Sequence, residues 1–382
     1  MSTKNFDKLK GFLDTFLDTG LPGFDCVIYY DGECVLRHSG GYADAENKIR
    51  HTGRELYNIY SCSKPITCTA ALQLFEKGLL RLEDRLSDFI PEFETMYVAC
   101  DAKTSGATDG INLSDLSVKG DMKNVVKAKN PITIKDLFCM TGGFSYDTVS
   151  PQLMLARKAT DGRCPTVETV KYLAKEPLLF EPGTNHAYSL CHDVLAAVVE
   201  VVSGKSFGQY VKENIFNPLD MKDSTFNLPE SQLDRVAEQY RYNEQTSLFE
   251  NVGKEIQTYK LGAEFESGGA GCVSSVDDYI KFTEALRKGD IILKRETIDM
   301  MTIPRVREDQ YVNELYNYGL GVRCPKKGSP ATDFGWGGAA GAYLAIDRPQ
   351  KVSLFYAQHA LNSPNNRSNQ IIWEIKKILN EY

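Results

Sequence analysis

The amino-acid sequence predicts an α/β (α+β) protein in which strands near both ends of the chain bracket a mainly helical middle. Strand-like runs bounded by turn signals occur at 24–38 and again at 341–358. Helical periodicity dominates from about 61 to 250. We therefore expect an α/β domain built from residues 1–60 and 255–382, and a mainly helical domain at 61–254.

Composition and charge exclude several classes of protein. The 382 residues include 20 Tyr, 18 Phe and 2 Trp, which argues against low-complexity disorder. The net charge of −7 argues against a general nucleic-acid binder, which needs a basic surface. No signal peptide and no run of apolar residues long enough for a membrane span is found. We expect a cytoplasmic protein whose 10 scattered cysteines are reduced.

The N-terminal elements are a helix and a hairpin. Apolar residues recur at helical spacing with Asp and Lys between them, which predicts an amphipathic helix; they are Phe6, Leu9, Phe12, Leu13, Phe16 and Leu17. Asp31-Gly32, a strong two-residue turn signal, separates the strand-like runs 24–30 and 33–38.

The middle and C-terminal elements follow from periodicity and capping signals. Gly204 resembles a helix C-cap, and Ser206 with Gln209 resembles a capping box. A polar stretch at about 101–130 predicts a long surface excursion, which could cover a cleft. The expected helices are 64–78, 133–140, 166–175, 190–203, 206–216, 276–287 and 366–380, and the expected C-terminal strands are 341–346 and 352–358.

Ser61-Cys62-Ser63-Lys64 is the first candidate for chemistry. The segment opens a predicted helix with Pro65 in the first turn, and side chains at i and i+3 project from one face. A buried lysine, its pKa lowered from about 10.4, could take the proton of the serine. Taken alone, the spacing favours a Ser/Lys pair on a solvated first turn of the helix.

Two further segments carry weaker signals. Tyr188 lies where the turn after Pro182-Gly183 meets the helix 190–203, so it could relay protons or simply cap the helix. Glycines in the run 334–341, which contains Trp336, let a ligand or a second backbone approach a strand closely. The same glycines also fit an ordinary turn beside a core tryptophan.

Other motifs favour structural roles. Gly204-Lys205-Ser206-Phe207-Gly208 matches G-x-S-x-G, but a helix and not a strand precedes Ser206. The 5 histidines show no metal-binding spacing, although His186 and His192 flank Tyr188. A glycosidase pair of carboxylates can be neither found nor excluded among many acidic residues.

Taken in order, S-x-x-K at 61–64, Tyr-Ser at 188–189 and Trp-Gly-Gly at 336–338 resemble the serine β-lactamase and penicillin-binding-protein superfamily. The resemblance extends over nearly the whole chain; it includes the segments 60–67, 70–78, 131–138, 141–144, 180–183, 216–221 and 267–271. It implies the β-lactamase/DD-peptidase fold, an antiparallel sheet flanked by terminal helices beside a helical domain, with the active site in the cleft between them.

Two departures from the superfamily pattern are informative. Leu190 stands where class C β-lactamases and DD-peptidases carry the Asn of Tyr-x-Asn, and Trp336 stands where they carry Lys or His. The missing groups would bind the amide and carboxylate of a β-lactam or peptide. The Tyr-Ser-Leu and Trp-Gly-Gly pattern is instead similar to family VIII carboxylesterases and related acyltransferases.

The resemblance implies a role for each candidate residue. Ser61 is the nucleophile, and Lys64 and Tyr188 share acid–base work. The backbone N–H groups of Ser61 and Ala339 form the oxyanion hole. Trp336, Gly337, Gly338, Leu190 and Phe144 line the substrate pocket.

The expected function is serine hydrolysis of small carboxylic esters through an acyl-enzyme, with acyl transfer to another alcohol as an extension. No metal or organic cofactor, nucleic acid or membrane is implied, and the oligomeric state is unreadable. The alternatives are a β-lactamase or DD-peptidase, and a non-catalytic binding protein on the same scaffold.

Overall fold

The computed structural model describes residues 6–100, 124–254, 259–311 and 313–380. The expected excursion at 101–130 lies mostly outside these residues; within its described part, β6 (Val125–Lys127) pairs with β5 (Tyr97–Ala99). In the described part of the chain no helix has the length and apolar character needed to cross a bilayer.

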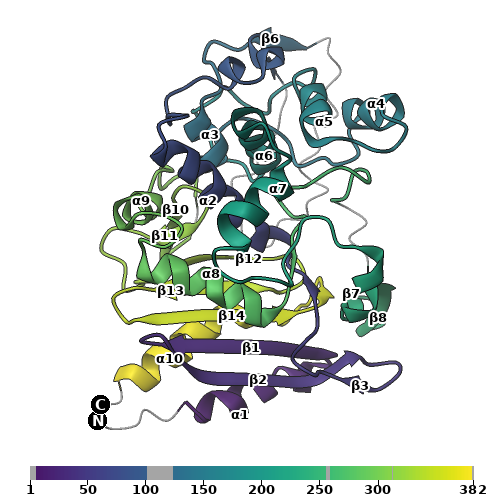
Figure 1. Ribbon diagram of the computed structural model, residues 1–382, viewed down its shortest axis with the longest axis vertical. Coiled ribbons are helices and arrows are strands. Elements are labelled where there is room, and N and C mark those ends of the chain that lie inside the picture. Colours follow the sequence, from purple (N-terminus) through teal and green to yellow (C-terminus); the bar gives the residue numbers. More distant parts are fainter. Residues whose placement is uncertain (1–5, 101–123, 255–258, 312, 381–382) are drawn as a thin grey trace.

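An eight-stranded antiparallel sheet joins the two ends of the chain, in the order β10-β11-β12-β13-β14-β1-β2-β3 (Figure 1). At its centre the N-terminal β1 pairs with the C-terminal β14. The strands are β1 (Gly23–Tyr30), β2 (Glu33–Asp44), β3 (Ile49–Arg50), β10 (Tyr316–Tyr318), β11 (Arg323–Pro325), β12 (Phe334–Gly337), β13 (Tyr343–Asp347) and β14 (Val352–Gln358).

The predicted hairpin is confirmed, because β1 and β2 pair antiparallel across Asp31-Gly32. Asp31 has φ 51° and Gly32 has φ 91°, and two positive values are what a type I′ turn requires.

Both faces of the sheet are covered by helices. Alternate residues of β14 point to opposite faces, as a strand requires. Phe355 stacks on Tyr279 of α8 (Val276–Lys288), with ring centroids 4.1 Å apart. Tyr356 instead packs against Phe16, beside α1 (Lys8–Asp14), on the face that also receives α10 (Ile371–Asn380) (Figure 1). The predicted terminal helices are therefore present, and both are shorter than expected.

A buried charge network ties α10 to the sheet, which the sequence did not predict. Lys376 Nζ lies 2.9 Å from Asp333 Oδ1 and 3.2 Å from Asp347 Oδ2, and both carboxylates are fully buried. Arg323 completes the network, 2.7 Å from Asp333.

Replacing Lys376 with methionine is expected to lower the free energy of unfolding by about 3–5 kcal/mol, because two buried carboxylates lose a cation. Urea unfolding followed by circular dichroism measures this. Lys377→Met is the control, since Lys377 is exposed and pairs with Glu374 on the same helix; it should change stability by about 0.5 kcal/mol or less. Equal effects of the two variants would contradict the prediction.

Helices α2 to α7 lie beyond the sheet, on the side of α8 (Figure 1). They are α2 (Ser63–Glu76), α3 (Ile134–Cys139), α4 (Pro151–Ala159), α5 (Thr166–Leu173), α6 (Cys191–Ser203) and α7 (Phe207–Val211), and α9 (Arg295–Met301) follows α8. The expected helix 206–216 is α7 continued by a π-helix, Lys212–Phe216. Gly204 caps α6 with φ 69°, which confirms the predicted C-cap. The Ser206 hydroxyl accepts from Gln209 N, so Ser206 is the N-cap of α7; the Gln209 side chain donates to Glu213, so the reciprocal half of the predicted capping box is absent.

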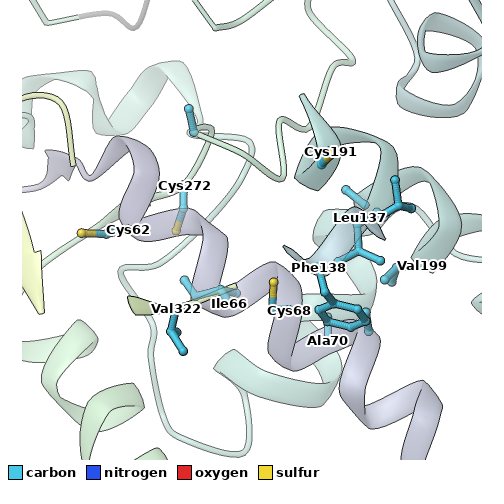
Figure 2. Packing of buried hydrophobic residues seen from close by; sticks show 14 of the residues in the cluster. Cys62, Ile66, Cys68, Ala70, Leu137, Phe138, Cys191, Val199, Cys272 and Val322 are labelled. Carbon is cyan, nitrogen blue, oxygen red and sulfur yellow. The ribbon is translucent and has the colours of Figure 1, made fainter. Parts of the chain in front are cut away.

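Helix α2 runs through the core of this helical part. Figure 2 shows its residues Ile66, Cys68 and Ala70 among side chains of other elements, including Phe138 and Val199. Burial on all sides explains why its apolar residues follow no single stripe.

Short strands also occur among the helices and were not predicted. They are β4 (Tyr57–Asn58) paired with β9 (Val273–Ser274), and a small sheet of β15 (Ala360–Leu361), β7 (Gln239–Asn243) and β8 (Leu248–Gly253). The β4–β9 pair places residues 267–274 beside the segment that leads into α2. The division into two domains remains a prediction.

Candidate active site

Ser61 lies in a 3-10 turn, Tyr60–Cys62, directly before α2. Tyr60 has φ 47°, a left-handed conformation that is strained for a tyrosine. Its hydroxyl donates to Gln239 Oε1 at 2.5 Å, and Ser63 Oγ donates to its carbonyl at 2.6 Å. These bonds hold the strained residue, so Ser61 is presented half-buried at the start of the helix.

Lys64 is fully buried beside Ser61. Its Nζ lies 3.3 Å from Ser61 Oγ, and it donates to the carbonyl of Gly269 at 2.7 Å. Burial lowers the pKa of Lys64 to about 7, against the opposing influence of the Asp193 carboxylate. Much of the amine is therefore neutral near neutral pH, as a general base requires.

Tyr188 approaches Ser61 from the segment before α6. Its hydroxyl donates to Ser61 Oγ at 2.6 Å and receives a hydrogen bond from Trp336 Nε1 at 3.4 Å. Burial raises the pKa of Tyr188, so its phenol stays protonated. Ser61 Oγ therefore contacts both an amine with a lowered pKa and a phenol with a raised one.

The Trp-Gly-Gly segment lies against the residues that precede Ser61. A Cβ on Gly338 would sit 2.4 Å from the carbonyl oxygen of Ile59, so only glycine permits this approach. Trp336 stacks on Tyr188 with ring centroids 5.9 Å apart, whereas Gly337 and Ala339 are exposed. The end of β12 is thus positioned close to the chain at Ser61.

Two predicted pocket residues are buried in the core cluster. Phe144 is 3% exposed and packs edge-on against Phe93, and Leu190 is 4% exposed at the N-cap of α6. Contact of either residue with substrate remains a prediction.

The sequence did not single out Tyr146, Asp193 or the carbonyl of Gly269. The hydroxyl of Tyr146 lies 3.4 Å from Lys64 Nζ, and its ring stacks on Tyr188. Asp193 accepts hydrogen bonds from Ser267 Oγ at 2.5 Å and from the N–H of Gly269 at 3.3 Å. Asp193 therefore holds the turn whose carbonyl receives the Lys64 amine.

Changing Asp193 to asparagine is expected to shift the rise of a pH–rate profile for an ester substrate to lower pH. The carboxylate raises the pKa of Lys64, so its loss lowers that pKa further. The substitution also weakens one hydrogen bond of the turn, which costs about 1 kcal/mol. The plateau of the pH–rate profile should therefore fall about fivefold.

Asp136→Asn is the matched control, because Asp136 is buried and bonded to Thr133 and Thr141 at a different place. It should leave the midpoint of the profile unchanged. A midpoint that moves equally in both variants, or in neither, would contradict this role of Asp193.

The histidines and Ser206 lie apart from this arrangement. Burial lowers the pKa of His186 to about 4 and that of His192 to about 3, so both rings are neutral. The His192 ring contacts the carbonyl of Phe138 at 3.2 Å. Ser206 caps α7, which supports its structural interpretation.

Neither a metal-binding cluster nor a disulfide occurs among the described residues. Among them, no group of three or more His, Cys, Asp or Glu side chains is arranged to hold a metal ion. The ten cysteines, all within the described ranges, are unpaired.

A serine between a buried lysine and a tyrosine, beside an antiparallel sheet, defines a β-lactamase-like class of protein. Residues 6–375 match the family model described as Beta-lactamase, and the chain belongs to that family. Its sheet and flanking helices are those that the resemblance implied, which confirms the predicted fold.

Two named relatives are each 26% identical to this chain. Protein Rv1367c of Mycobacterium tuberculosis is similar over 377 residues, which cover 92% of this chain and 89% of the relative. A putative D-alanyl-D-alanine carboxypeptidase of Escherichia coli K12 is similar over 402 residues, 95% of this chain and 84% of the relative.

Solved structures show the same fold. EstCE1, described as a hydrolase with promiscuous acyltransferase activity, has a TM-score of 0.74 at 24% identity and 98% coverage of both chains. Simvastatin synthase (LovD) from Aspergillus terreus has a TM-score of 0.73 at 20% identity, covering 97% of this chain and 98% of that one.

Proposed function

We propose that the protein is a serine hydrolase that cleaves small carboxylic esters through an acyl-enzyme on Ser61. One observation carries the proposal: Ser61 Oγ lies within hydrogen-bonding reach of both Lys64 Nζ and Tyr188 OH. Two neighbouring groups with pKa values moved in opposite directions are the arrangement that separates a base from an acid.

In the first half-reaction, the neutral amine of Lys64 takes the proton of Ser61 while Oγ attacks the ester carbonyl carbon. Backbone N–H groups of Ser61 and Ala339 stabilise the oxyanion of the tetrahedral intermediate. The bond to the alcohol oxygen then breaks, and Tyr188 gives that oxygen its proton. Lys64, bearing the proton from Ser61, restores the phenol.

In the second half-reaction, water attacks the acyl-enzyme and passes its proton to the Tyr188–Lys64 pair. The ester bond to Oγ breaks, the carboxylic acid leaves, and Ser61 regains its proton. An alcohol in place of water gives a new ester by the same steps. EstCE1 is described as a hydrolase with promiscuous acyltransferase activity and LovD as a simvastatin synthase, which is consistent with that extension.

A β-lactamase or DD-peptidase is the second candidate, favoured by the name of the Escherichia coli relative. Against it, Leu190 offers no amide for a peptide substrate, and Trp336 offers no cation for a carboxylate. The indole N–H of Trp336 is instead directed to Tyr188.

The test compares p-nitrophenyl acetate and butyrate with a chromogenic cephalosporin and a D-Ala-D-Ala peptide, using purified protein. Ester turnover without cephalosporin or peptide cleavage is the expected result. Fast cephalosporin or peptide cleavage would overturn the ester proposal in favour of the second candidate. No turnover and no labelling of Ser61 by a fluorophosphonate would indicate a binding protein.

A further inference from the structure

The Tyr188 hydroxyl gives up its proton during the proposed reaction, when it protonates the leaving alcohol. The phenolate that results is disfavoured, because burial raises the pKa of Tyr188. Lys64, which later returns a proton, has its Nζ over the face of the Tyr188 ring, 4.4 Å from the ring centroid. The phenolate oxygen therefore needs a further hydrogen-bond donor in the interval before that proton arrives.

The indole N–H of Trp336 is such a donor. Its Nε1 lies 3.4 Å from the Tyr188 hydroxyl oxygen, and an indole N–H donates but does not accept, so the phenol oxygen receives this bond. A donor aimed at that oxygen favours the charged phenolate and opposes the effect of burial on the pKa of Tyr188. Hydrogen bonds to charged acceptors are shorter and stronger than those to neutral ones, so we expect this bond to tighten when the phenolate forms.

Packing on several sides holds the indole in this orientation. The backbone of Trp336 pairs with Leu344 in the ladder between β12 and β13. Its ring stacks on Tyr188 with an angle of 19° between the ring planes. The buried ring of Tyr318 packs edge-on against the indole, with ring centroids 5.0 Å apart. A donor that is fixed in place before the reaction costs no reorganisation when the charge appears.

We propose that Trp336 is a positioning residue for proton transfer, whose indole N–H holds the Tyr188 oxygen and stabilises the phenolate formed when Tyr188 protonates the leaving alcohol. This inference rests on the ester proposal and gives Trp336 a role beyond lining a pocket. In the step concerned, the C–O bond of the tetrahedral intermediate breaks while the O–H proton of Tyr188 passes to the departing alcohol oxygen. The phenolate accepts the hydrogen bond of Trp336, and the Lys64 ammonium then returns a proton to it.

Butyrate esters that differ only in their alcohol test this role. Their kcat/KM values report acylation with one common acyl group. The anion of p-nitrophenol is a weak base and leaves without a proton, whereas ethoxide is a strong base and needs one. Trp336→Phe keeps an aromatic ring but removes the N–H, so it should lower kcat/KM for ethyl butyrate about tenfold more than for p-nitrophenyl butyrate, with phenyl butyrate between them.

Trp336→His is the rescuing variant, because imidazole Nε2 occupies the same ring position as indole Nε1 and can carry the N–H. It removes the second ring of the indole, so both rates can fall, but their ratio should stay within about threefold of the native ratio. Trp373→Phe is the matched control. Trp373 is the other of the 2 tryptophans of the chain, packs on α10 against the core cluster at the two chain ends, and should affect neither ester.

Labelling by a fluorophosphonate, from which fluoride leaves as an anion, should keep its native rate in Trp336→Phe and so show that the variant is folded and its Ser61 active. Equal loss of all three esters in Trp336→Phe, no loss of any, or a Trp336→His ratio as altered as that of Trp336→Phe would overturn the inference. So would a native enzyme that cleaves only the p-nitrophenyl ester, since it would have no proton transfer to the alcohol. A native protein that cleaves no ester would refute the ester proposal and this inference together, so the two failures are distinguishable.

Discussion

Replacing Ser61 with alanine is expected to lower kcat/KM for p-nitrophenyl butyrate by about 10³–10⁶-fold, because no acyl-enzyme can form without the hydroxyl. Initial rates measure the loss. Intact-mass spectrometry after treatment with a fluorophosphonate should show a single adduct on the native protein and none on the variant. With native enzyme, a burst of p-nitrophenol before a slower steady rate would report the same intermediate.

Ser206→Ala provides the matched control, since Ser206 belongs to the second serine motif of the chain. Its hydroxyl caps α7, so the variant should lose about 1 kcal/mol of stability and keep its activity. Ester turnover by Ser61→Ala within tenfold of the native rate, or loss of turnover in folded Ser206→Ala, would refute the assignment of Ser61.

The parts of the fold that the sequence predicted are those with local signals. The Asp31-Gly32 turn, the Gly204 C-cap and the Ser206 N-cap act over a few residues, and the structure confirms each. The short strands β4 and β9 carry no such signal. They pair because the folded chain brings Tyr57 and Ser274 together, so only tertiary structure identifies them.

The groups of the candidate site likewise divide into those that carry a signal in the sequence and those that only the folded structure reveals. Ser61 and Lys64 could be paired from their spacing on a helix, and Tyr188 followed from the superfamily resemblance. The Gly269 carbonyl could not be found, because every residue carries a backbone oxygen and only the fold selects this one. Asp193 escaped notice for a related reason: its carboxylate acts on Lys64 through a turn distant in sequence.

Phe144 and Leu190 belong to the core cluster, and their contact with substrate remains a prediction. Their neighbours in sequence, Tyr146 and Tyr188, contact the Lys64–Ser61 pair, whereas their own side chains are buried among apolar groups. Adjacent residues in irregular segments point in different directions, so membership of a motif does not by itself place a side chain in a pocket.

Changing Lys64 to methionine is expected to lower kcat/KM for an ester by about 10²–10⁴-fold, the usual contribution of a general base. In the native enzyme the rate should rise with pH through about 7, because only the neutral amine can accept the proton of Ser61. The protonated amine predominates below that pH and the neutral amine above it. In the variant this rise should be absent, and the residual rate should not follow a titration near pH 7.

The pH dependence separates a base from a packing residue. Methionine preserves the length of the side chain, so a role confined to packing would leave the profile intact at a lower amplitude. Lys77→Met removes an amine from the C-cap of α2, where Lys77 donates to the Tyr210 hydroxyl at 3.4 Å and lies over the Tyr210 ring, and it should change neither rate nor profile. A Lys64→Met enzyme that still rises in rate near pH 7 would assign the titration to another group and leave Lys64 without its proposed role.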